Sequence, residues 1–119
     1  MELSIRAASE REVRLRVDLD ELWDNGARSL QAGGIGALAD AAMRFAVCRH
    51  TVTDRNWVAL NLEVSATTAI EPRQGPLWVT ARVVEEIPAG RRAAAEISDS
   101  NGKHIAHAES VYGRPAALD

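Results

Sequence analysis

The stretch LQAGGIGALAD, residues 30–40, places small residues at a predicted helix start and a carboxylate further along the same helix. The first backbone N–H groups of a helix have no partner within it and lie at the positive end of the helix dipole. Small residues such as Ala32 and Gly33 let a negatively charged oxygen approach these groups closely. Asp40 could act on a substrate as a general base or as a nucleophile. The stretch could therefore combine an anion-binding helix start with a working carboxylate.

Each of these features also has a purely structural explanation. Gly33 and Gly34 could simply allow the chain to turn and pack closely before the helix. Asp40 lies four residues before Arg44, a spacing at which side chains on a helix form an ion pair of roughly 0.3–0.5 kcal/mol. Periodicity alone favours this ion pair, because Asp40 lies outside the apolar stripe of the helix.

One long helix is predicted from Gly34 to Arg49. Its apolar residues recur at helical spacing and form a single stripe: Ile35, Leu38, Ala39, Ala42, Met43 and Ala46. Other segments alternate between polar and apolar residues, as half-buried strands do. These strands are expected within residues 11–18, 56–66 and 77–87 and, as a hairpin around Asn101-Gly102, within residues 91–113.

The order of a strand, a helix and then four strands in a meander predicts an α+β fold, with one antiparallel sheet and the helix on one of its faces. Residues 1–119 fit a single domain, in which residues 114–119 are expected to form a loose tail. One helix cannot cover a sheet of five or more strands. Part of the sheet or its edge should therefore meet another molecule, and a second copy of the chain is the simplest candidate.

The composition argues against several kinds of partner. The net charge of −3 gives no general case for binding nucleic acid or membranes. No apolar run approaches the roughly 20 residues that span a bilayer, and the first residues lack the basic start and apolar run of a signal peptide. We therefore expect a cytoplasmic protein. His104 and His107 are three positions apart, which places them on opposite faces of a strand, so no metal site is expected.

Three segments of the sequence carry a resemblance to a known family. LQAGGIGALADAAMRFA, VALNLEVSATTAIEPRQGPLWVTARVV and GRRAAAEISDSNGKHIAHAESVY are similar to its helix start, its second strand pair and its final hairpin, in that order. Together they resemble the small acyl-CoA thioesterases of the phenylacetyl-CoA thioesterase branch, over residues 11 to 113. The resemblance implies a hotdog fold, in which an antiparallel sheet of about five to six strands wraps around one long central helix.

The resemblance also implies roles for individual residues. Asp40 falls on the catalytic carboxylate of the family, which would act as a general base on water or as a direct nucleophile on the thioester carbon. Backbone amides near Ala32 and Gly33 would form the oxyanion hole. The family reads His-Gly-Gly at this helix start, where the present chain has Gln31-Ala32-Gly33. Gln31 cannot titrate, so it is either a positioning group or a polar loop residue.

The separation of Ala32 and Asp40 sets a geometric constraint. The eight positions between them correspond to a rise of about 12 Å along a helix. A reacting carbon must lie roughly 3 Å from both the nucleophile and the oxyanion donor. The site should therefore combine Asp40 of one subunit with the helix start of another. The resemblance implies the same, because sites of the family lie at a homodimer interface, and such dimers often pair into homotetramers.

The substrate implied by the resemblance is an acyl-CoA, with no separate cofactor. Coenzyme A carries phosphates, for which Arg55, Arg73, Arg91 and Arg92 could supply positive charge, although each of them, taken singly, is more typical of a solvated surface residue. The leading interpretation is a thioesterase for a small or medium acyl- or aryl-CoA. The alternatives are a hotdog protein that binds acyl thioesters without hydrolysis, a hydratase or dehydratase, and a structural or interaction role.

Overall fold

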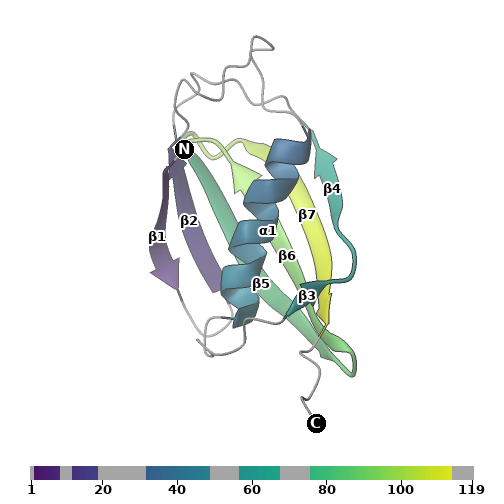
Figure 1. Ribbon diagram of the computed structural model, residues 1–119. Coiled ribbons are helices and arrows are strands. Elements are labelled where there is room, and N and C mark those ends of the chain that lie inside the picture. The colour runs from purple at the N-terminus through teal and green to yellow at the C-terminus, as the bar shows by residue number, and fades with distance from the viewer. Residues whose placement is uncertain (1, 9–11, 19–31, 49–56, 68–75, 114–119) are drawn as a thin grey trace.

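The computed structural model describes residues 2–8, 12–18, 32–48, 57–67 and 76–113. Figure 1 shows one helix lying across a curled antiparallel sheet. The elements in chain order are β1 (Glu2–Ala8), β2 (Glu12–Asp18), α1 (Ala32–Cys48), β3 (Val58–Ala59), β4 (Glu63–Ala66), β5 (Leu77–Ile87), β6 (Gly90–Ser98) and β7 (His104–Gly113). This arrangement is the α+β hotdog fold that the sequence predicts.

The sheet has the strand order β1-β2-β5-β6-β7-β3, and β4 also pairs with β7. β3 pairs with Tyr112 and Gly113, whereas β4 pairs with residues 106–109 of the same strand. β3 and β4 therefore share one edge position, which gives a sheet six positions wide and confirms the predicted five to six strands. β1 was not predicted, and it forms the opposite edge by pairing with β2.

The core lies between α1 and the face of the sheet that the helix covers. The predicted helix stripe is buried throughout, with each side chain at most 2% exposed: Ile35, Leu38, Ala39, Ala42, Met43 and Ala46. Buried residues of the sheet include Val13, Leu15, Val17, Leu77, Val79, Ala93, Ala95, Ala106 and Ala108. The small alanine side chains of β6 and β7 let the helix approach the sheet closely. In the part of the chain that the structure describes, no helix has the length and apolar character needed to span a membrane.

The start of α1 bears on the proposed anion site. The helix begins at Ala32 rather than at the predicted Gly34, so Ala32 and Gly33 both belong to its first turn. It continues without interruption to Cys48. The first turn, Asp40 and the end of the helix therefore lie along one rigid axis.

The edge strand is interrupted between β3 and β4. The N–H of Leu60 still donates to the carbonyl of Val111 at 2.8 Å. At Asn61 the side chain replaces the backbone, because its Oδ1 accepts the N–H of Val111 at 2.8 Å. The hydroxyl of Ser110 donates to the carbonyl of Asn61. Side-chain hydrogen bonds thus bridge the break and keep this segment attached to β7.

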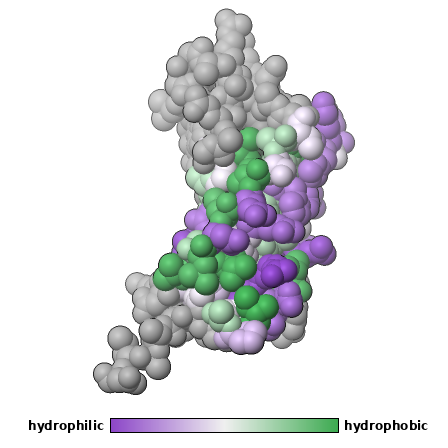
Figure 2. Space-filling view, turned by 90° about the vertical axis from the view of Figure 1, so that its right-hand side faces the viewer, coloured by the Kyte–Doolittle hydropathy of each residue, from purple (hydrophilic) through white to green (hydrophobic). Residues whose placement is uncertain are grey.

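Apolar side chains are exposed along the same edge. Val58, Leu60 and Leu62 are 58%, 60% and 43% exposed. Figure 2 looks onto this side of the molecule and shows hydrophobic surface in its lower half, interrupted by hydrophilic side chains. Apolar groups on an edge strand are typical of a surface that pairs with another chain. The contact of this edge with a second copy stays a prediction.

Candidate active site

Asp40 lies in the middle of α1 and turns its carboxylate toward β7. The hydroxyl of Tyr112 donates to Oδ1 of Asp40 at 2.6 Å. Nε of Arg44 donates to both carboxylate oxygens, at 3.2 Å to Oδ1 and 3.0 Å to Oδ2. The side chain of Asp40 remains 31% exposed. Asp40 is therefore held in a fixed position and is still accessible from outside.

Arg44 ties this carboxylate to the edge of the sheet. Its Nη1 donates to the carbonyl of Trp57 at 3.1 Å, immediately before β3. Its guanidinium carbon lies 5.4 Å from the centroid of the Tyr112 ring. The hydrogen bond to Asp40 raises the pKa of Arg44 above its ordinary value. The ion pair predicted from the four-residue spacing is therefore present, and it belongs to a larger set, Asp40, Arg44 and Tyr112, which we call the Asp40 cluster.

Tyr112 is the member of the cluster that the sequence did not reveal. Its side chain is buried, and burial, followed by the hydrogen bond to Asp40, raises the pKa of its phenol well above the ordinary range. The phenol therefore stays protonated at neutral pH. A protonated hydroxyl beside a carboxylate can only donate, so its hydrogen bond to Asp40 has one fixed direction.

The helix start lies far from Asp40 within one chain. Ala32 and Asp40 occupy the same continuous helix, so the rise between them is about 12 Å, as predicted. The N–H groups of the first turn, which have no partner within the helix, cannot contact the same thioester as the Asp40 carboxylate of their own chain. Gln31 lies outside the described residues.

Two of the four candidate arginines, Arg91 and Arg92, lie in the described part of the chain. Arg91 donates to the carbonyl of Val47 in the last turn of α1 and, from Nε, to Glu86 at 2.8 Å. Its guanidinium also lies 4.8 Å from the centroid of the Trp57 ring. These contacts stabilise the helix end and occupy hydrogen-bond donors of Arg91, whose side chain is still partly exposed. Arg55 and Arg73 lie outside the described residues.

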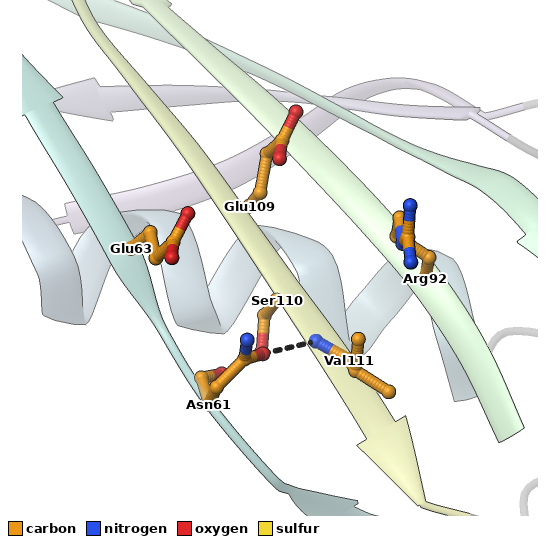
Figure 3. A pocket seen from close by; sticks show the side chains of 6 residues that line it. All are labelled: Asn61, Glu63, Arg92, Glu109, Ser110 and Val111. Carbon is orange, nitrogen blue, oxygen red and sulfur yellow. Dashed lines mark hydrogen bonds between the residues drawn. The ribbon is translucent and has the colours of Figure 1, made fainter. Parts of the chain in front are cut away.

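Arg92 lines a shallow pocket at the break in the edge strand. The pocket has a volume of about 220 Å³ and is lined by Asn61, Glu63, Arg92, Glu109, Ser110 and Val111. Figure 3 shows the side chains of Glu63, Glu109 and Arg92 around it, with α1 on the other side of the strands. Arg92 also pairs with Glu85 at 3.5 Å. Two carboxylates beside one guanidinium make a phosphate an unfavourable ligand here, and Asp40 is not among the lining residues.

The prediction that His104 and His107 lie on opposite faces of their strand is wrong. Nε2 of His104 lies 2.5 Å from Glu96, and Nδ1 of His107 contacts the other oxygen of the same carboxylate. The register of β6 and β7 shifts between Ile97 and Ser98, which pair with Ala106 and His104. The extra residue on β7 breaks the alternation and brings both histidines to one face. Within the described ranges, no group of residues is placed to hold a metal ion.

The contact between His107 and Glu96 should make stability depend on pH. The hydrogen bond to Glu96 raises the pKa of His107, and hydrogen bonds from His107 and His104 outweigh burial and lower the pKa of Glu96. A histidine whose pKa is raised by folding contributes its full stability below its unfolded pKa and loses it as the pH rises through the folded pKa. A carboxylate whose pKa is lowered by folding contributes its full stability above its unfolded pKa and loses it as the pH falls through the folded pKa. The contribution is therefore largest between about pH 4.5 and 6.5.

We expect the free energy of unfolding, measured in urea, to fall between pH 6 and pH 8. The fall should be less than about 1 kcal/mol, because the side chains of His107 and Glu96 are partly exposed. Glu96→Gln should reduce this difference, and the contact of His107 Nε2 with Glu109 at 3.2 Å should keep the remainder. Glu85→Gln is the matched control, since it breaks a pair with Arg92, whose charge does not change in this range. Equal pH dependence in wild type and Glu96→Gln would contradict the assignment.

Comparisons with known proteins address the fold. No family model and no curated protein matches the chain by sequence. Among solved structures, the PaaI protein of the E. coli phenylacetic acid degradation operon has a TM-score of 0.81 at 21% identity, covering 94% of this chain and 82% of PaaI. Zebrafish thioesterase superfamily member 2 has a TM-score of 0.81 at 18% identity, covering 96% and 81%.

A third similar structure is AziG from S. sahachiroi, with a TM-score of 0.83 at 16% identity, covering 95% of this chain and 90% of AziG. The structural neighbours thus include members of the thioesterase superfamily. The predicted hotdog fold is confirmed by these likenesses over nearly the whole chain.

Proposed function

We propose that this hotdog chain is an acyl-CoA thioesterase that hydrolyses a small or medium acyl- or aryl-CoA. The observation that carries the proposal is the Asp40 carboxylate on the central helix, which is held by Tyr112 of β7 and Arg44 of α1 and is still accessible. Among the described residues, Oδ1 accepts hydrogen bonds from Tyr112 and Arg44, whereas Oδ2 accepts from Arg44 alone. Oδ2 therefore keeps room for a further hydrogen bond, as a general base requires.

The proposed reaction begins with water attacking the carbonyl carbon of the thioester. Asp40 takes the proton of that water, and the carbonyl oxygen becomes negative. The free amides of Ala32 and Gly33 would stabilise this oxygen. The carbonyl then re-forms, the carbon–sulfur bond breaks, and the leaving thiolate takes the proton from Asp40. The products are a carboxylic acid and the free thiol of coenzyme A. Direct attack by Asp40 on the carbonyl carbon is the other route open to this carboxylate.

A second copy of the chain would complete the site. The distance along α1 separates Asp40 from the amides of its own helix start. The exposed apolar residues Val58, Leu60 and Leu62 offer a surface for pairing on the edge strand next to the Asp40 cluster. We therefore propose a homodimer in which each site takes Asp40 from one subunit and the first turn of α1 from the other. Dimers of this kind could pair further into tetramers.

A second function is also supported by a specific observation. Both oxygens of Asp40 already accept hydrogen bonds from Arg44, and this ion pair competes with a role in proton transfer. The chain could therefore bind acyl thioesters without hydrolysing them. A hydratase is less consistent with the structure, since the described histidines 104 and 107 contact Glu96 and not Asp40.

Thiol release from a panel of acyl-CoAs tests the proposal. The panel should include phenylacetyl-CoA, benzoyl-CoA and straight-chain acyl-CoAs from acetyl to decanoyl, with binding measured in parallel by calorimetry. We expect turnover of at least one short, medium or aryl member. Binding without thiol release across the panel would replace the thioesterase by the binding protein, and neither binding nor release would reject both.

A further inference from the structure

We propose that Tyr112 and Arg44 are positioning residues for Asp40, which fix Oδ1 and present Oδ2 to the reacting water or thioester carbon. This inference rests on the proposed function and adds to it the groups that orient the carboxylate. It assigns a role in the reaction to a tyrosine on the last strand, far from Asp40 in the sequence.

The two carboxylate oxygens of Asp40 accept different sets of hydrogen bonds. Tyr112 Oη donates to Oδ1 at 2.6 Å, a short charge-assisted hydrogen bond. Arg44 Nε lies between the two oxygens, 3.2 Å from Oδ1 and 3.0 Å from Oδ2. Tyr112 holds Oδ1 while Arg44 bridges both oxygens, and the two donors together restrict rotation of the carboxylate about its last bond. A fixed carboxylate reaches its attack geometry without further loss of conformational freedom.

Tyr112 and Arg44, the two donors to Asp40, are themselves held in place by further contacts. Tyr112 is fully buried, and its ring is held on β7, which pairs with β6 and β3. Arg44 is 43% exposed, but its guanidinium is fixed at a second point by the carbonyl of Trp57. Tyr112 is therefore positioned by the sheet, and Arg44 on the helix is tied to the sheet edge by its hydrogen bond to Trp57. Together they fix the orientation of the Asp40 carboxylate.

The Asp40 cluster lies next to β3 at the edge of the sheet. Trp57 directly precedes β3, and Tyr112 pairs with Ala59 of β3. The cluster thus connects Asp40 to the same edge that we propose as the contact with a second subunit. Pairing at that edge would set the distance between Asp40 and the amides supplied by the partner.

Kinetics of Tyr112→Phe and Arg44 variants test the role. Tyr112→Phe keeps the ring and removes only the donor, and we expect kcat to fall by about 10- to 100-fold with KM unchanged. Arg44→Met should also lower kcat, and Arg44→Lys, which keeps a cationic donor, should recover part of the loss. In an Asp40→Asn background, Tyr112→Phe should cause no further loss, because the oriented group is gone.

Arg14→Met is the matched control for the arginine variants. Arg14 lies on β2, and its guanidinium carbon is 4.2 Å from the centroid of the Trp78 ring on β5. β5 and β6 separate β2 from β7. Arg14→Met, like Arg44→Met, removes a guanidinium that packs on an aromatic ring, but Arg14 does not belong to the Asp40 cluster. We expect kcat to stay within twofold of wild type.

A measurement without substrate tests the contact itself. Tyr112 is the single tyrosine of the chain, so the near-ultraviolet absorbance of tyrosinate reports this residue alone. Without the negative charge of Asp40, the phenol should ionise at lower pH in Asp40→Asn than in wild type. Circular dichroism recorded along the titration separates this change from unfolding.

The outcomes distinguish the two proposals. If wild type hydrolyses acyl-CoA but Tyr112→Phe keeps its kcat, the positioning role is wrong and the thioesterase stands. If wild type releases no thiol, the thioesterase fails and the positioning role fails with it. An unchanged tyrosine titration in Asp40→Asn would overturn the contact on which the inference depends.

Discussion

Replacement of Asp40 by Asn should lower kcat for thioester hydrolysis by about 10²- to 10⁴-fold, the usual contribution of a general base. Asn has nearly the same shape, and its amide oxygen can still accept the hydrogen bond from Tyr112. It cannot take a proton or attack the thioester carbon. The loss should therefore appear in kcat, measured by thiol release, while binding of the acyl-CoA stays close to that of wild type.

The competing explanation for Asp40 is a surface ion pair with Arg44, and the same variant separates the two. An ion pair of this exposure is worth less than about 1 kcal/mol of stability, and its loss would leave the reaction intact. Asp18→Asn is the matched control, because it removes the same kind of carboxylate from a pair with Arg16 at 3.1 Å. Hydrolysis that survives Asp40→Asn as well as it survives Asp18→Asn would reject the mechanism.

Much of the fold could be predicted because its signals are local. The stripe from Ile35 to Ala46 repeats at helical spacing, and every residue of it is buried. The hairpin at Asn101-Gly102 forms as expected, with Gly102 at a φ of 82°. β1 was missed although it is as long as β2; it lies at an edge of the sheet, and a register shift between Ile5 and Ala7 interrupts its pairing. The bulge that unites His104 and His107 was missed because alternation along a strand gives no sign of an inserted residue.

The candidate site was predicted in part for the same reason. Asp40 and Arg44 are four residues apart, so their pairing follows from helix geometry. Tyr112 is 72 residues from Asp40, and its contact depends on how β7 lies beneath the helix. Arg91 looked like a free surface charge, but the end of α1 lies within its reach and takes up its donors. Contacts of this kind depend on tertiary packing, which periodicity does not encode.

The composite site leads to a prediction that a single-chain site would not give. Gly33→Pro removes one amide from the first turn of α1, where proline is tolerated. Loss of one oxyanion donor typically lowers kcat by about 10²- to 10³-fold. A chain with Gly33→Pro and a chain with Asp40→Asn should each be nearly inactive as a homodimer. Mixed together after unfolding and refolding, they should regain activity.

The regained activity follows from symmetry. In a mixed dimer, one site receives both defects, and the other combines the intact Asp40 of one chain with the intact helix start of its partner. Random pairing makes half of the dimers mixed, each with one working site, so the mixture should reach about a quarter of wild-type activity. If Asp40 worked with its own helix start, every site would carry one defect and mixing would restore nothing. Light scattering on the same samples must show dimers or larger assemblies, because an active monomer would contradict a site shared between subunits.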